Sequence, residues 1–346
     1  QSWTLLMKWR GRNKSNNIID RRNSRISGIR GGRGGGIIRL LPVVFRFLGF
    51  KGTLLLIAGI FAYALFTGNL QNLFAIIGLQ SPTAVTSSEP LRQTAEEKQL
   101  ADFVAVVLAD TEATWTALFE QNGERYQEPK LVLFRGAVQS ACGTAQSAIG
   151  PFYCPADQQV YIDLGFFNQL EQQLNAPGDF AQAYVIAHEV GHHVQTLLGI
   201  SQQVYEARRH ASEVEANKLS VLQELQADCF AGIWAHYADN TRQMLEDGDI
   251  KEGLTAASAI GDDTLQKQSQ GYVSPDTFTH GSAAQRVEWF KTGFNSGKIQ
   301  SCNTFDLTVT TPVVSDNVFS SLTDSDKATK PMAYSHLEHN PCKHDC

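Results

Sequence analysis

The feature that most constrains this chain is the sequence His-Glu-Val-Gly-His, from His188 to His192. Apolar residues recur at helical spacing around it, from Phe180 to Leu198, which predicts a largely buried helix. Two histidines four residues apart lie on one face of a helix, where both imidazoles can reach a single Zn²⁺. Glu189 lies between them and can polarise a metal-bound water. The sequence therefore predicts a metal centre of the hydrolytic kind.

The flanking residues support a helix with the motif at its middle. Asn175, Pro177 and Asp179 supply a turn and a helix N-cap, and Gly199 is suited to the position just after the last turn. His193 is rotated by about 100° from His192 around the helix, so we expect it to pack or to form hydrogen bonds, without binding the metal.

A catalytic zinc site has three protein ligands and one open position, so a third ligand must come from elsewhere. Glu224 and Asp228 share one face of a second predicted helix, four residues apart. We expect Glu224 to bind the metal and Asp228 to accept the outer N–H of a zinc-bound histidine. The competing third ligands are Asp228 itself, His210, Glu213, Glu215, His236 and His280.

Two further candidates lie near the end of the domain. His280 precedes a helix on which Ser282 and Gln285 are spaced as a capping box, and Arg286 follows in its first turn. Either side chain could stabilise the oxyanion that develops during hydrolysis. Purely structural roles are equally compatible with the sequence.

Charge is distributed unevenly along the chain. The first 51 residues hold twelve of the 29 Lys and Arg and one of the 35 acidic residues. A basic arm can bind nucleic acid, but this one is rich in glycine and continues into an apolar segment, so we expect no nucleic acid. We predict a disordered cytoplasmic arm over 1–46 and one transmembrane helix over 47–68.

The remainder predicts a linker at 69–90, a folded domain over 91–302 and a disordered tail over 303–346. The domain pattern is a long helix from Thr94 to Gln121, two strands at 130–134 and 159–163, and then the motif helix. This order predicts a mainly helical α+β domain with a small sheet, as in zincins. The strand at 160–163 is a candidate edge strand for docking an extended peptide, or a plain core strand.

Cysteine usage is compatible with an oxidising compartment. Cys142 and Cys154 bracket a short loop that a disulfide could close, while Cys229 and Cys302 are either a second pair or two buried thiols. The C-terminal His and Cys residues match no closed zinc pattern. With the arm in the cytoplasm, the domain is expected on the periplasmic or extracellular side of the cell membrane.

Several separated motifs together resemble the bacterial neutral zinc metallopeptidase family. They are Met7-Lys8-Trp9-Arg10-Gly11, Tyr153-Cys154-Pro155, 187–195 with the metal motif, 224–228 and Thr279-His280-Gly281-Ser282. The resemblance implies a zincin fold and membrane attachment. A more distant similarity to membrane metallopeptidases of the heat-shock and CaaX-processing type implies Glu224 as third ligand, Asp228 behind it, and His280 with Arg286 near the site. Gly281 replaces the proline of that pattern.

These observations favour a zinc-dependent endopeptidase that acts on protein or peptide substrates. Zn²⁺ is held by His188, His192 and Glu224, and Glu189 is the general base. Two alternatives stay open: a membrane-anchored, non-catalytic zinc-containing binding module, and a zinc amidase that acts on cell-wall material.

Overall fold

The structure is a computed structural model that describes residues 7–24 and 93–307. It is rich in helices and has two small sheets, so the α+β prediction is confirmed at this level. The helices are α3 (Ala95–Gln121), α4 (Gly165–Gln172), α5 (Asp179–Leu197), α6 (Ile200–His210), α7 (Glu213–Asn240), α8 (Asp249–Ala259), α9 (Asp262–Gln270) and α10 (Ala283–Ser296). The strands are β1 (Ile18–Asp20), β2 (Lys130–Phe134), β3 (Ala137–Ser140), β4 (Gly143–Gln146), β5 (Phe152–Cys154) and β6 (Gln159–Asp163). Short 3-10 turns lie at Ser147–Ile149, Pro275–Thr277, Ile299–Cys302 and Thr304–Leu307.

The larger sheet has the strand order β1-β2-β6-β5. β1 and β6 both run parallel to β2, and β5 runs antiparallel to β6. The two strands predicted at 130–134 and 159–163 are therefore observed as β2 and β6. The prediction of an edge at 160–163 is wrong, because β6 is paired on both sides; the edge strand beside the motif helix is β5.

The N-terminal segment belongs to this domain. Met7 and Trp9 are buried in the main core, and the Trp9 ring packs edge-on against Phe103 of α3 at 5.4 Å. The segment then pairs through β1, with Ile18 opposite Leu131. The predicted disordered arm over 1–46 is therefore wrong for 7–24, and 25–46 lies outside the described residues. The average composition of the arm, basic and rich in glycine, concealed a short strand and two apolar anchors.

The predicted membrane anchor at 47–68 and the linker at 69–90 also lie outside the described residues. Within 7–24 and 93–307, none of the helices combines the length and the apolar character that a membrane crossing requires. The segments on either side of 25–92 pair with each other through β1 and β2. A single crossing would place these two strands on opposite sides of a membrane, so the structure does not support the single-pass arrangement.

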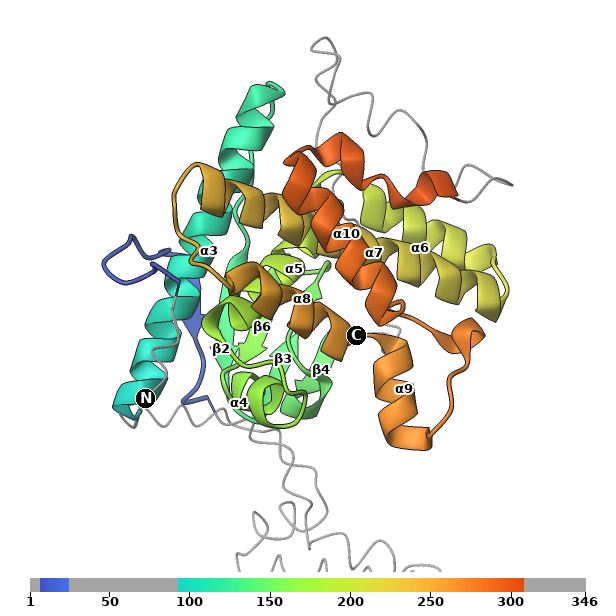
Figure 1. The fold of residues 1–346 in the computed structure, drawn as a ribbon, viewed down its shortest axis with the longest axis horizontal. Coiled ribbons are helices and arrows are strands. Elements are labelled where there is room, and N and C mark those ends of the chain that lie inside the picture. Colours follow the sequence, from blue (N-terminus) through green and yellow to red (C-terminus); the bar gives the residue numbers. More distant parts are fainter. Residues whose placement is uncertain (1–6, 25–92, 308–346) are drawn as a thin grey trace, which may run out of the picture. The chain divides into compact units, whose positions relative to one another are not determined.

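The motif helix α5 lies at the centre of the helical layer, with α3, α7 and α8 packed around it and β5 and β6 beside it (Figure 1). α10 packs closely against α7. At Gly293 an added Cβ would lie 1.9 Å from the carbonyl oxygen of Cys229, so only glycine permits this approach of the two backbones. The close contact carries Arg286, at the start of α10, toward the acidic face of α7.

The cysteines form two disulfides, Cys142–Cys154 and Cys229–Cys302. The second ties α7 to the last turns of the domain. Two residues of the predicted tail, Thr304 and Phe305, are buried there, and the Thr304 hydroxyl donates to the carbonyl of Leu222 at 2.6 Å. The tail prediction over 303–346 is therefore wrong for 303–307, and the remainder lies outside the residues that the structure describes.

Candidate metal centre

The two motif histidines lie one turn apart on α5, with their ring centroids 4.8 Å apart and their planes nearly perpendicular. Gly178 occupies the N-cap position and Asp179 is the first helical residue; Gly199 takes the left-handed conformation after the last turn, as predicted. His188 and Glu189 are each only 7% exposed. The helix therefore presents its motif from a mostly buried position.

Glu224 of α7 completes a triad with the histidines. Its Oε2 lies 3.1 Å from His188 Nε2, and its Oε1 lies 3.3 Å from His192 Nε2. One ligand atom of each residue lies within 4.8 Å of those of the other two. Among the competing candidates, Asp228 lies at the opposite ring nitrogen of His188, and His236 contacts the carbonyl of Phe294.

The donor set fits a zinc ion. Two imidazole nitrogens and one carboxylate oxygen are the three-ligand set of a catalytic zinc site. Burial lowers the pKa of His188, but the Asp228 and Glu224 carboxylates on its two sides raise it to about 10. In Glu224, burial raises the pKa, yet the neighbouring histidines hold it well below its usual range. The triad thus favours positive charge at its centre, which a divalent cation supplies.

A buried network fixes His188 from behind. Asp228 Oδ1 lies 2.8 Å from His188 Nδ1, and the Tyr184 hydroxyl donates to the same oxygen. Arg286 donates to both oxygens of Asp228, at 2.8 and 2.9 Å. Because an acceptor faces Nδ1, the ring holds its proton there and leaves Nε2 free to bind a metal.

Arg286, a predicted catalytic residue, lies on the side of His188 opposite Glu224. It is 2% exposed, and its Nη2 is 3.4 Å from His188 Nδ1, which is the edge of the ring that faces away from Glu224. On this side of the ring the guanidinium contacts Asp228 and the Tyr184 hydroxyl. Its contacts instead neutralise and orient Asp228.

His192 has its own support. Its Nδ1 lies 2.9 Å from Gln195 Oε1, and Gln195 Nε2 donates to Gln226 Oε1 at 3.0 Å. Gln226 in turn donates to the carbonyl of Cys302 at 2.9 Å, beside the second disulfide. Both metal-facing rings are therefore held through their outer nitrogens.

Glu189 is the remaining acidic group of the motif. Burial raises its pKa, and the positive charge of His188 and His192 acts in the opposite direction. A carboxylate with a raised pKa beside a metal triad is suited to accept a proton and to return it.

His280 lies at the rim of the site. Asp262 holds it, with Oδ2 accepting from the His280 backbone N–H at 2.6 Å and Oδ1 lying 3.3 Å from Nδ1. Burial lowers the pKa of His280, but Asp262 and Glu224 raise it overall, and 46% of the side chain is exposed. The structure thus gives an accessible imidazole with a raised pKa, close enough to Glu224 for the two groups to interact electrostatically.

The family described as "Putative neutral zinc metallopeptidase" matches residues 7–305 of this sequence. The chain belongs to this family. It is 48% identical over 299 residues to the uncharacterized protein YpfJ of Escherichia coli K12. The aligned residues make up 86% of this chain and 99% of that protein. It is 45% identical over 190 residues to the uncharacterized protein Rv2575 of Mycobacterium tuberculosis H37Rv. This alignment includes 52% of this chain and 63% of that protein. No solved structure matches the chain.

For this member of the metallopeptidase family, sequence reasoning missed the residues that support the triad. Tyr184 lies one turn before His188, and Gln195 lies three residues after His192. Both are polar residues on a buried stretch of α5, and that is the signal that could have found them. His193 follows its prediction: it is buried and lies 3.1 Å from the Tyr153 hydroxyl and 2.6 Å from the carbonyl of Gln127.

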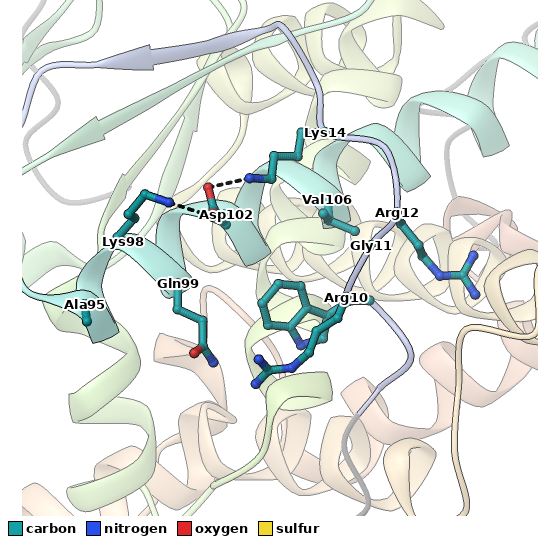
Figure 2. A pocket seen from close by; sticks show the side chains of 10 residues that line it. Arg10, Gly11, Arg12, Lys14, Ala95, Lys98, Gln99, Asp102 and Val106 are labelled. Atoms are coloured by element: carbon teal, nitrogen blue, oxygen red, sulfur yellow. Dashed lines mark ion pairs between the residues drawn. The ribbon is translucent and has the colours of Figure 1, made fainter.

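A pocket of about 510 Å³ lies apart from the triad, between the N-terminal segment and α3 (Figure 2). Lys14 and Lys98 converge there on Asp102, at 2.7 and 3.6 Å. The residues that line this pocket include none of the candidate site residues, so we assign it no part in the metal chemistry.

Proposed function

We propose that this protein is a zinc-dependent endopeptidase with a zincin-like domain. The observation that carries the proposal is the convergence of His188 Nε2, His192 Nε2 and a Glu224 oxygen, with Glu189 adjacent on the same helix. Family membership supports zinc and hydrolysis but names no substrate. A bound zinc ion would polarise the scissile carbonyl and acidify a water molecule.

The protein residues have distinct roles in this proposal. Glu189 takes the proton from the attacking water and delivers it to the leaving amine. His280 donates a hydrogen bond to the developing oxyanion from the rim of the site. Asp228, with Arg286 behind it, fixes the orientation and tautomer of His188. The positions of these groups described above support the proposed roles.

We further propose that the domain works outside the cytoplasm, on the periplasmic or extracellular side. The two disulfides support this location, because such bonds persist in oxidising compartments. Since β1 is part of the domain, residues 7–24 lie on that side as well. A tag at the N-terminus that is protected from external protease while the domain is cleaved would contradict this arrangement.

The test uses the full chain, because a fragment starting at residue 91 would lack β1. Zinc-loaded protein is incubated with an unstructured protein such as casein, beside Glu189→Gln, and the zinc content of both is measured. We expect equal zinc and a loss of roughly 10²- to 10⁴-fold in kcat/KM for Glu189→Gln. If both bind zinc and neither cleaves, general peptidase activity is refuted, and a non-catalytic zinc module or a cell-wall amidase becomes the better account.

A further inference from the structure

A second group of acidic side chains lies at the beginning of the motif helix. Asp179 opens α5, and Asp249 and Glu252 lie in the first turn of α8. One carboxylate oxygen of each lies within 4.8 Å of those of the other two. His188 is nine residues further along α5, about 14 Å along the helix axis, so this group is separate from the zinc triad.

Each of these carboxylates has one oxygen occupied by a backbone N–H. Asp179 Oδ1 accepts from Met7 at 3.3 Å, Glu252 Oε2 from Phe180 at 3.2 Å, and Asp249 Oδ2 from Glu246 at 2.8 Å. These bonds fix where the carboxylates lie. They also leave a second oxygen on each group for another partner.

Two of the second oxygens are buried and unsatisfied. Asp249 is 1% exposed, and its Oδ1 is shielded from solvent without a hydrogen-bond partner among residues 7–24 and 93–307; the same holds for Asp179 Oδ2. A buried carboxylate oxygen without a partner destabilises the fold, because it has lost its hydrogen bonds to water and gained none in return. Such atoms indicate a ligand that the protein residues do not supply.

The charge around the group is unbalanced. The acidic groups that act on Asp249 include Asp179, Glu246 and Asp239 in addition to Glu252. Arg10 acts on Asp179, and Lys8 is paired with Glu246 at 2.9 Å. Burial and the acidic neighbours together raise the pKa of Asp249 to about 6 and that of Glu252 to about 7.

Gly178 makes the arrangement possible. Its φ is +115°, and a Cβ added there would lie 2.0 Å from Glu252 Oε2. Any side chain at this position would displace the Glu252 carboxylate from the end of α5. The backbone is thus shaped to admit a third carboxylate where two are already present.

We propose that Asp179, Asp249 and Glu252 bind a hard divalent cation of the Ca²⁺ class, which joins the N-terminal ends of α5 and α8. Ca²⁺ binds oxygen ligands at about 2.3–2.6 Å, so two oxygens on one ion lie at most about 5 Å apart, as these do. The absence of nitrogen and sulfur donors from the group disfavours zinc. The cation stabilises the start of the helix that carries His188 and His192.

The experiment uses the zinc-loaded full chain and Tb³⁺ as a luminescent substitute for Ca²⁺. Trp234 stacks on Phe180 with ring centroids 5.7 Å apart, which puts an indole near the site to sensitise emission. Asp249→Asn preserves the shape and removes the charge. Asp247→Asn, an exposed acid on the same loop, is the matched control, and Glu224→Gln separates the zinc triad from this site.

We expect bound Tb³⁺ to emit, and Ca²⁺ to reduce this emission by displacing Tb³⁺. The Ca²⁺ affinity should be at least tenfold weaker in Asp249→Asn and unchanged in Asp247→Asn and Glu224→Gln. Ca²⁺ at about 100 times its Kd should raise Tm by roughly 5–10 °C in the unmutated protein and not in Asp249→Asn. In Ca²⁺-free buffer Asp249→Asn should be at least as stable as the parent, because repulsion is relieved. The proposal is overturned if Asp249→Asn binds Tb³⁺ and Ca²⁺ like the parent, if only Glu224→Gln abolishes binding, or if the parent binds neither ion.

Discussion

Replacing Asp228 by Asn tests the network that supports the metal centre. Asp228 is fully buried and accepts from Arg286, Tyr184 and His188. The substitution keeps the shape and removes the negative charge, which leaves the guanidinium of Arg286 buried without its counter-charge. Breaking a buried ion pair in this way costs about 3–5 kcal/mol of unfolding free energy. The outer nitrogen of His188 loses its carboxylate as well, so zinc affinity should fall by about 10- to 100-fold.

Two measurements on the same preparations check this. Urea unfolding of zinc-free protein gives the stability loss, and chelator competition gives the zinc affinity. Arg286→Met is the companion variant, and in the double variant the combined loss should be smaller than the sum of the single losses by about 1–3 kcal/mol. The reasoning fails if Asp228→Asn unfolds within 1 kcal/mol of the parent (roughly the average for any substitution) and binds zinc equally well.

Three further predictions follow from packing, covalent links and titration. Trp9→Ala should cost about 3–5 kcal/mol in urea unfolding, because it empties a core position of the N-terminal segment; an effect below 1 kcal/mol would mean that the segment is dispensable. Replacing both Cys229 and Cys302 by Ala should cost about 4 kcal/mol, since the bond closes a loop with a sequence separation of 73; reductant should then lower the stability of the variant much less than that of the parent, because only Cys142–Cys154 remains to be reduced. Without Ca²⁺, the free energy of unfolding should fall as pH rises from about 4 to 7. In this range the folded chain holds protons at Asp249 and Glu252, with pKa values of about 6 and 7, whereas the unfolded chain has released them. Asp249→Asn should flatten this dependence on pH, and a variant profile identical to that of the parent would contradict the assignment.

Local signals in the sequence predicted much of the fold. The long helix predicted from Thr94 to Gln121 is observed as α3, with Thr94 as its N-cap, and Ser282 with Gln285 forms the capping box of α10 as predicted. These features depend on neighbouring residues and on period, which a single sequence displays. β6 was identified as a strand for the same reason. The position of β6 between two other strands was not predicted, because contacts between residues distant in sequence decide which strands pair.

In the candidate site, too, local sequence predicted some features and contacts distant in sequence determined the others. His188, Glu189 and His192 come from one motif, and Glu224 was favoured by spacing and by family resemblance; the structure brings these residues together, and their roles stay predictions. Arg286 was expected near the reacting atoms and lies behind His188, because only the packing of α10 on α7 determines which side of the ring it reaches.

The pairing of β1 with β2 has a consequence for the order of folding. Asn17 and Lys130, which form a hydrogen bond beside these strands, are 113 residues apart in sequence. At a synthesis rate of about 5–20 residues per second, the first strand waits roughly 6–20 seconds for its partner to leave the ribosome. During that time Met7 and Trp9 have no core to bury them. Because so long a loop must close, we expect the last step of folding to be slow. In this step the N-terminal segment docks onto a helical core that has already formed.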